Sequence, residues 1–192
     1  GLNDVAFHVD MTQERKGFAS EVEMNALRLR YIDMARGLPV SVIFNTTVFA
    51  GNMHEVPEIA RFFVQHNDVV RFASFQLGAD TGRGTVPGRD PVVVTQASVC
   101  QAIEQGAGIA LNFDALHGGH RSCNRYALLL SIGQHHFDAL QYAPLAQRVM
   151  RETAEVEFAR GQNLRGAWAL AKALLQKRHL AGSVAASLPC TW

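Results

Sequence analysis

The sequence predicts an α/β fold, a partial parallel β/α barrel that is followed by a C-terminal helical extension. Strand-like and helix-like segments alternate along the first half of the chain, and polar residues follow each apolar strand. Such alternation is typical of a parallel sheet with crossover helices. The chain has 192 residues, whereas a complete eight-stranded barrel typically needs about 250 residues. We therefore expect an incomplete barrel over residues 1–135 and helices over residues 136–192.

Three strand–helix repeats begin the chain. The expected elements are strands over residues 5–10, 40–44 and 69–75, and helices over residues 21–36 and 54–66. The strands are short apolar runs, as in the buried strands of a parallel sheet. The helices show apolar residues near helical spacing, and Gly37 with Pro39 ends the first of them.

The second half of the chain gives weaker signals. Gly and Pro residues predict a linker over residues 83–91, and Thr95 is the expected N-cap of a helix that reaches residue 104. Further expected elements are a short strand over residues 109–113, a strand or a buried helix over residues 126–132, and helical structure over residues 143–179 with breaks near Gly161 and Gly166. Periodicity does not choose between the two alternatives for residues 126–132.

Composition and charge exclude several classes of protein. The formal net charge is +1, which gives no reason to expect nucleic acid or an anionic membrane as a partner. No segment approaches the roughly 18 apolar residues that span a bilayer, and residues 1–10 lack the features of a signal peptide. Three dispersed cysteines argue against a disulfide framework, so a cytoplasmic location is expected. The first residue is not methionine, and a strand pattern follows almost at once, which suggests part of a longer product.

Polar residues at the ends of the expected strands are the first candidate site. They are Asp10, residues 45–47 (Asn45, Thr46 and Thr47) and residues 76–83, which include Gln76 and Arg83. The carboxyl ends of parallel strands meet at one edge of the sheet, so these residues should line a single site. Amides and hydroxyls suit a ribose or an amino-acid group, and Arg83 suits a carboxylate or phosphate. Turn chemistry is the stronger alternative for Asn45, Thr46 and Thr47, and it explains residues 80–84 as well as a ligand site does.

A loop with two histidines and a cysteine is the second candidate site. His117, His120 and Cys123 have the nitrogen and sulfur ligands that zinc or iron prefers. No fourth ligand is evident in the sequence, and glycine-rich loops with histidines occur without any metal. A catalytic pair of Cys123 with a histidine is a further alternative.

Three stretches of the chain resemble successive strands of the radical S-adenosylmethionine enzymes. Residues 2–13 (LNDVAFHVDMTQ) resemble the third strand of that family, residues 42–55 (VIFNTTVFAGNMHE) the fourth strand and the next helix start, and residues 69–76 (VVRFASFQ) with 81–83 (TGR) the fifth. Within the family, the similarity points to tetraether-lipid synthase and related radical methylases. It covers residues 2–84, weakens at residues 120–124 (HRSCN) and ends near residue 133.

The resemblance implies both a cofactor and a set of contacts. In this family a partial β/α barrel holds a [4Fe-4S] cluster through a C-x3-C-x2-C loop, and the cluster cleaves S-adenosylmethionine to a radical. The resemblance assigns Asp10, Asn45 and Thr47 to S-adenosylmethionine, and it places Gln76 and Arg83 near that cofactor or the substrate. By the same resemblance, His120 and Cys123 belong to a second iron–sulfur site.

The chain itself has no C-x3-C-x2-C motif. We therefore expect the cluster ligands upstream of this chain, and we expect the chain alone to be inactive. The substrate, a small molecule or a lipid-type molecule, is not readable from the sequence.

Two other functions fit parts of the sequence. One is a metal-dependent hydrolase or lyase on a β/α barrel, with metal-activated water as nucleophile. Its ligands would come from His8, Asp10, His54, Glu55, His117 and His120. The other is a cluster-free domain that serves as a binding module, which the absence of the cysteine motif favours.

Overall fold

The computed structural model of this chain describes residues 2–13, 15–78, 93–116, 118–120 and 123–154, and residues 168, 169, 171–173 and 176. Contacts divide the chain into two compact units, residues 1–110 and residues 111–192. The boundary between these two units, after residue 110, lies earlier in the chain than the boundary that the sequence predicted after residue 135. The linker expected over residues 83–91 and the candidate residue Arg83 lie outside the described residues.

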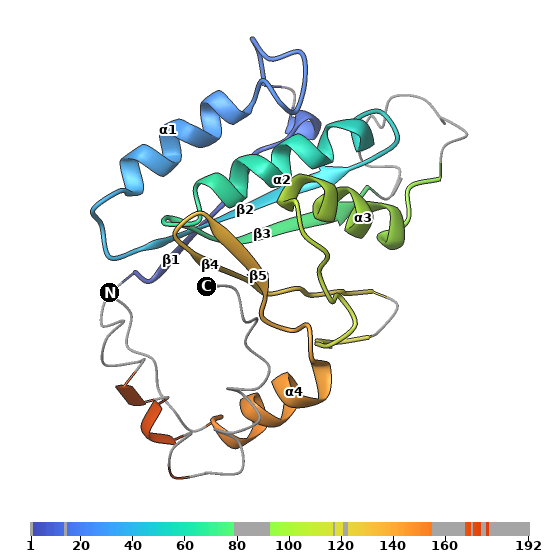
Figure 1. Cartoon of the computed structure of the whole chain (residues 1–192). Helices are drawn as coiled ribbons and strands as arrows, with labels where there is room; N and C mark the ends of the chain where they lie inside the picture. The colour runs from blue at the N-terminus through green and yellow to red at the C-terminus, as the bar shows by residue number, and fades with distance from the viewer. Residues whose placement is uncertain are drawn as a thin grey trace. The chain divides into compact units, whose positions relative to one another are not determined.

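The first unit contains a three-stranded parallel sheet. The strands β1 (Asp4–His8), β2 (Ser41–Val48) and β3 (Val70–Leu77) lie in the order β1-β2-β3, as Figure 1 shows. The mixed α/β class and the three parallel strands are therefore confirmed. The second strand is longer than expected, because Asn45, Thr46 and Thr47 belong to it. Their side chains alternate between buried and half-buried positions, as the two-residue period of a strand requires.

Three helices pack on one face of this sheet. They are α1 (Asn25–Ala35), α2 (Val56–Gln65) and α3 (Gln96–Ala107), and two short 3-10 turns, η1 (Met11–Gln13) and η2 (Met53–Glu55), precede α1 and α2. Residues of α1 and α2 form one core with Val42 and Phe44 of β2, and α3 packs on Val48 of the same strand. All three helices therefore cover the face to which the buried residues of β2 point (Figure 1).

Aromatic stacking joins the sheet to α1 and α2, and a capping box starts α3. Phe7 of β1 stacks on Tyr31 of α1 with ring centroids 4.3 Å apart, and Phe44 of β2 stacks on Phe63 of α2 at 5.3 Å. The helix α3 begins at the expected N-cap Thr95, whose side chain accepts a hydrogen bond from the Ser98 backbone amide in a capping box.

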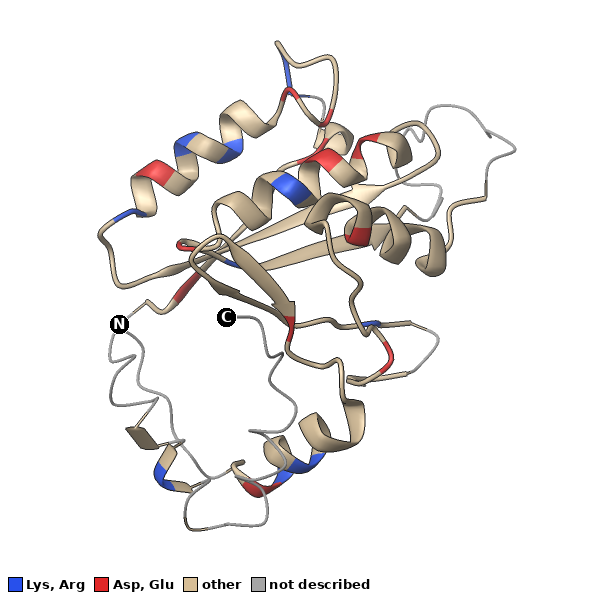
Figure 2. Ribbon diagram, in the orientation of Figure 1, with Lys and Arg blue, Asp and Glu red and all other residues tan. Residues whose placement is uncertain are grey.

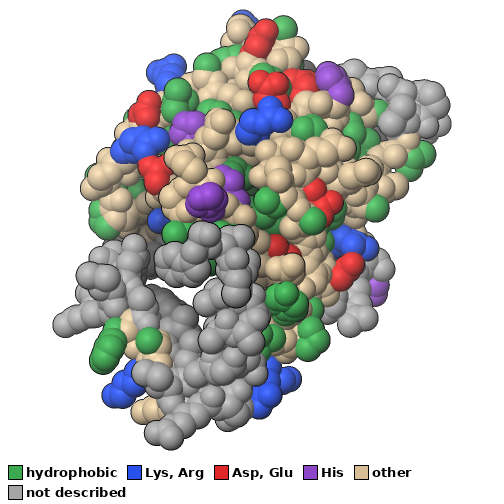
Figure 3. Space-filling model, in the orientation of Figure 1, with side chains coloured by type: hydrophobic (Ala, Val, Ile, Leu, Met, Phe, Trp, Pro, Cys, Tyr) green, Lys and Arg blue, Asp and Glu red, His purple; other side chains and the backbone are tan. Residues whose placement is uncertain are grey.

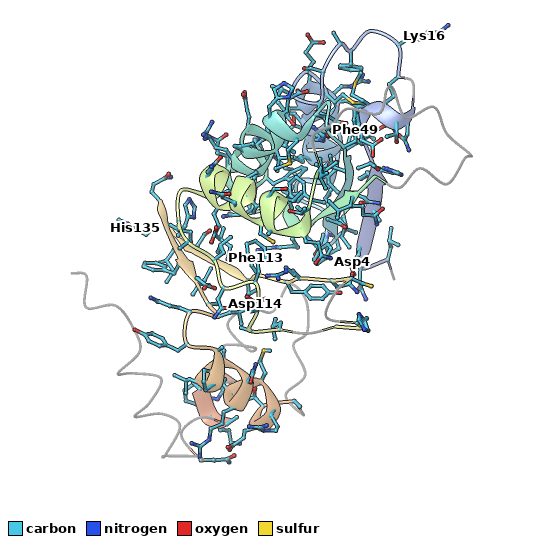
Figure 4. The ribbon with its side chains drawn as sticks, turned by 90° about the vertical axis from the view of Figure 1, so that its right-hand side faces the viewer. Asp4, Lys16, Phe49, Phe113, Asp114 and His135 are labelled. Atoms are coloured by element: carbon cyan, nitrogen blue, oxygen red, sulfur yellow. The ribbon has the colours of Figure 1, made fainter. Side chains whose placement is uncertain are left out.

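The opposite face of the sheet carries the remaining side chains in rows. Strand pairing aligns Ala6, Ile43 and Phe72 in one row, then His8, Asn45 and Ser74, and then Thr47 and Gln76. The first row is apolar and the other two are polar, with the polar rows at the carboxyl end of the strands. We call this side of the sheet, with these eight residues, the polar face, after its two polar rows. In Figure 4, Asp4 marks the start of β1 and Phe49 lies just past the end of β2, at the carboxyl end of the parallel strands.

The second unit contains a β-hairpin and a helix. The strands β4 (Leu129–Ile132) and β5 (His135–Asp138) are antiparallel, and Gly133 in the turn has a φ of 61°, which a glycine adopts without steric cost. This hairpin decides the alternative left open for residues 126–132 in favour of a strand. The helix α4 (Ala143–Glu152) starts where helical structure was expected over residues 143–179. The helical extension expected from residue 136 was wrong at its start, because residues 136–138 belong to β5. The breaks expected near Gly161 and Gly166 lie outside the described residues.

The expectation of a strand over residues 109–113 was wrong. Backbone and side-chain hydrogen bonds of Asn112 fix this segment in an irregular form instead. The Asn112 amide donates to Asp138 Oδ2 at 2.7 Å, and its side-chain Nδ2 donates to the Leu140 carbonyl at 3.2 Å. A backbone amide that donates to a side chain of another segment is not available for the hydrogen bonds of strand pairing.

Charged side chains lie mainly on the helices and loops of the first unit, and few occur on the strands (Figure 2). Over the helical layer, positive and negative side chains are interspersed in Figure 3, in agreement with the net charge of +1. In the described ranges, no helix combines the length and the apolar character that crossing a membrane requires.

Candidate functional site at the carboxyl edge of the sheet

Asp10 organises the carboxyl end of β1. The residue is fully buried. Its Oδ1 accepts hydrogen bonds from the backbone amide and the hydroxyl of Thr12, at 3.0 and 2.5 Å. Its Oδ2 accepts from the Thr47 backbone amide at 2.8 Å and lies 2.5 Å from His8 Nε2. Four donors therefore occupy the acceptor positions of one carboxylate.

The charge state of Asp10 follows from these contacts. Burial raises the pKa of this carboxyl, but hydrogen bonds from Thr12 and Thr47 and the nearby His8 outweigh it, so the pKa lies below its ordinary value. Asp10 is therefore a carboxylate at neutral pH. It joins the end of β1 to the backbone of β2 at Thr47.

A buried ion pair lies behind this edge, on the side of the helices. Arg28 of α1 and Glu21 are both fully buried, with Arg28 Nη2 2.9 Å from Glu21 Oε2. The same Nη2 donates to the Val9 carbonyl at 2.6 Å, and Nη1 donates to the Glu21 carbonyl and to Asn25 Oδ1, both at 2.8 Å. Burial lowers the pKa of Arg28, and burial raises the pKa of Glu21 even though Arg28 opposes that shift.

Asn52 links this pair to the loop after β2. Its Nδ2 donates to Glu21 Oε1 at 3.1 Å and to the Thr47 carbonyl at 2.9 Å, while its Oδ1 accepts from the Phe49 amide at 2.8 Å. The Met11 amide also donates to Glu21 Oε1, at 2.7 Å. Side chains on the helical side of the sheet therefore form hydrogen bonds with the backbone after β1 and after β2. These side chains do not reach the polar face.

The groups presented at the polar face are neutral or weakly basic. The His8 side chain is 42% exposed, and its Nε2 lies 3.3 Å from Thr47 Oγ1. Gln76 is exposed and is the strand partner of Thr47. The Oδ1 of Asn45 is buried and has no hydrogen-bond partner among the described residues. An amide acceptor in this state calls for a donor from a ligand or water.

The strand-end residues that the sequence assigned to one site lie close together where the structure describes them. Asp10 and Thr47 are in direct contact, and Thr47 pairs with Gln76 across β2 and β3. Asn45 lies one row away, paired with His8 and Ser74. The structure thus brings four of the predicted residues to one edge, whereas Arg83 lies outside the described residues.

The predicted metal residues His120 and Cys123 belong to the second unit. The Cys123 amide donates to the His120 carbonyl at 2.9 Å, so the two residues lie close together, and Cys123 is exposed. His117 lies outside the described residues. Among the residues that the structure describes, no group of three His, Cys, Asp or Glu side chains is arranged to hold a metal ion.

The sequence reasoning did not identify the roles of Arg28, Glu21 and Asn52, and it considered His8 only as a metal ligand. One signal for Arg28 was available. Met24, Arg28 and Ile32 follow one another at intervals of four residues, which puts them on the same stripe of a helix. A charged residue on an apolar stripe predicts a buried partner of opposite charge.

Comparison of this chain with models of protein families, with curated proteins and with solved structures gave no match. The carboxyl edge of the sheet is therefore the basis from which a function can be inferred. This edge offers hydrogen-bond donors and acceptors over a fixed backbone, together with one imidazole held by a carboxylate.

Proposed function

We propose that this chain forms the S-adenosylmethionine-binding part of a radical S-adenosylmethionine enzyme. The polar face would be the inner wall of an incomplete β/α barrel, with the cofactor at the carboxyl ends of β1, β2 and β3. Two features support this arrangement. The three strands lie in sequential order, and the described helices of the first unit pack on the same face of the sheet, as in a barrel wall. The stretches that resemble the family supply the three strands in the family's order.

The observation that carries the proposal is the buried Asn45 Oδ1 without a partner. A buried acceptor that lacks a donor costs about 1–3 kcal/mol, so a donor from a bound molecule stabilises it. S-adenosylmethionine has donors of this kind in its ribose hydroxyls and its ammonium group. Thr47 and Gln76, in the adjacent row, add a hydroxyl and an amide for the same molecule.

Asp10 has a different part in this proposal from the one that the resemblance implies. Because four donors already engage its carboxylate, it acts on a ligand through the groups that it holds. It fixes the backbone of Thr47 and the ring of His8. The apolar row, which includes the 46% exposed Phe72, provides a surface for the less polar part of the ligand.

The described residues do not fit a [4Fe-4S] cluster, because no group of three candidate ligands occurs among them. We propose that the cluster ligands lie upstream of this chain. Such a cluster would supply the electron for cleavage of S-adenosylmethionine, and Asn45, Thr47 and Gln76 would hold that cofactor at the polar face. A role of Arg83 near the cofactor or substrate, and of His120 and Cys123 in a second cluster, remains part of the proposal. The enzyme would work in the reducing cytoplasm on a small or lipid-type substrate.

Equilibrium dialysis of the full chain with radiolabelled S-adenosylmethionine tests the proposal. Wild-type protein should bind one equivalent, and Asn45→Ala should weaken binding roughly tenfold, because the ligand loses one hydrogen bond to a desolvated acceptor. Ser41→Ala is the matched control, since Ser41 lies on the same strand and face at the other end and should leave the affinity unchanged.

Two results would overturn the proposal. One is wild-type protein that binds no S-adenosylmethionine, and the other is Asn45→Ala protein that binds as tightly as wild type. A longer product with the cysteine motif should also form 5′-deoxyadenosine under anaerobic conditions with dithionite.

A further inference from the structure

We propose that His8 is a proton acceptor at the polar face and that Asp10 is the positioning residue that prepares it. In this arrangement Asp10 binds the Nε2–H of the imidazole, and Nδ1 is left to accept a proton from a hydroxyl or amine of a substrate. The inference goes beyond S-adenosylmethionine binding and does not depend on it.

The tautomer of His8 follows from its contacts. Asp10 accepts hydrogen bonds from three other donors and is ionised, so the hydrogen between Asp10 Oδ2 and His8 Nε2, which lie 2.5 Å apart, belongs to the imidazole. Neutral His8 then carries its hydrogen on Nε2 and a lone pair on Nδ1. Among the described residues, none makes a hydrogen bond to Nδ1.

A purely structural role explains this contact less well. Thr12 and Thr47 already satisfy both carboxylate oxygens of Asp10, so the fold does not need His8 as a fourth donor. The His8 side chain is 42% exposed, and water would solvate its Nε2 at little cost. The result of the contact is a fixed ring, which is what an oriented general base requires.

The charges around His8 suit a proton acceptor. Asp10 would stabilise the imidazolium after the transfer. From the loop after β1, Arg15 Nη2 donates to the His8 carbonyl at 3.0 Å. On the strands beside it, Asn45 and Thr47 are neutral. Behind the sheet, the charge of Arg28 is neutralised by Glu21.

The proposed step is a simple proton transfer. The O–H or N–H bond of the substrate breaks, the proton moves to Nδ1, and the bonding electron pair stays on the substrate. Return of the proton from Nδ1 closes the cycle, so no oxidant or second reactant is needed.

Two measurements on the full chain test the inference without any S-adenosylmethionine. A long-range ¹H–¹⁵N spectrum identifies which ring nitrogen of His8 carries the hydrogen, with the signal assigned by its loss in His8→Gln. Reaction with diethyl pyrocarbonate at pH 8, followed by peptide mass spectrometry, measures the reactivity of His8 against the exposed His54 in the same molecule.

The expected results are the Nε2–H form in wild type and a reactivity of His8 above that of His54. Asp10→Asn should lose the fixed tautomer and lower the His8 rate roughly tenfold, as expected when one hydrogen bond to a charged group is removed. Asp68→Asn, an exposed carboxylate that pairs with Arg36, is the control and should change neither quantity.

Two outcomes would overturn the inference. The first is a wild-type protein in which Nδ1 carries the hydrogen, a result that needs no variant to fold. The second is a His8 that reacts no faster than His54. Because neither measurement involves S-adenosylmethionine, their failure is separate from failure of the cofactor proposal, which the dialysis experiment decides.

Discussion

The guanidinium of Arg28 and the carboxylate of Glu21 form an ion pair, 2.9 Å between Nη2 and Oε2, that is fully buried behind the carboxyl edge of the sheet. Arg28 comes from α1, and Glu21 comes from the segment between β1 and that helix. The pair bonds to the Val9 carbonyl of the β1 end and, through Asn52, to the loop after β2. The fold therefore places charged groups behind the edge to hold the backbone from which His8 and Thr47 extend.

Arg28→Met should destabilise the protein strongly. The substitution leaves the Glu21 carboxylate buried without its partner, and breaking a buried ion pair on one side typically costs about 3–5 kcal/mol. Urea unfolding followed by circular dichroism measures the loss. Arg36→Met is the control, because among the described residues Arg36 pairs with the exposed Asp33 and Asp68, and exposed pairs contribute about 0–1 kcal/mol. Equal losses for the two variants would contradict a special role of the buried pair.

Asp10 should contribute stability at neutral pH that acid removes. Its pKa in the folded protein lies below the ordinary value of 3.8, so the unfolded chain binds its proton first as the pH falls. The contribution of Asp10 is fully present above pH 3.8 and is lost as the pH falls through the lower folded value. Glu21 has the opposite sign, since its pKa is raised and its contribution is lost as the pH rises.

The two contributions can be separated by a difference measurement. The free energy of unfolding of wild type minus that of Asp10→Asn, measured by urea unfolding from pH 7 down to pH 2.5, cancels the Glu21 contribution. The difference should be constant near neutral pH and should shrink at the acid end. A difference that grows as the pH falls would show that the folded pKa of Asp10 is raised.

Gly106→Ala should force α2 and α3 apart. A Cβ atom at this position would lie 2.1 Å from the Pro57 carbonyl oxygen and 2.8 Å from the Ala60 Cβ, and both neighbours belong to α2. Overpacking of this kind typically costs about 1–3 kcal/mol, more than alanine gains as a helix former. Thermal unfolding measures the effect. Gln105→Ala, at the exposed neighbouring position, is the control and should not lower the midpoint.

Thr95→Ala should weaken the start of α3. The Thr95 hydroxyl accepts a hydrogen bond from the Ser98 amide at 3.1 Å, and the Ser98 hydroxyl accepts from the Thr95 amide at 3.0 Å. Loss of an N-cap side chain typically costs about 1 kcal/mol. Amide hydrogen exchange should become faster in the first turn of α3, whereas the exchange of β2 should not change. Thr95→Ser, which keeps the hydroxyl, should behave like wild type.

The positions of the elements in the first unit could be predicted from local features. Apolar runs identified β1, β2 and β3, helical spacing identified α1 and α2, and Thr95 marked the start of α3. The prediction from sequence was wrong where a side chain bonds to the backbone of a segment that is distant in the chain. The bonds of Asn112 to Asp138 and Leu140 prevent a strand over residues 109–113, and nothing near Asn112 in the sequence indicates them.

The sequence by itself determined that polar residues end three successive strands, because apolar strands and polar ends are local patterns. It also determined that Asp10, Thr47 and Gln76 come to one edge, since parallel strands in sequential order place their carboxyl ends together. Only the tertiary structure decided which of these side chains is buried and fully hydrogen-bonded and which is presented at the polar face. Asp10 lies 2.8 Å from the Thr47 amide and 2.5 Å from His8 Nε2. Hydrogen bonds between residues 37 positions apart in the chain depend on strand register and burial, which local spacing does not specify.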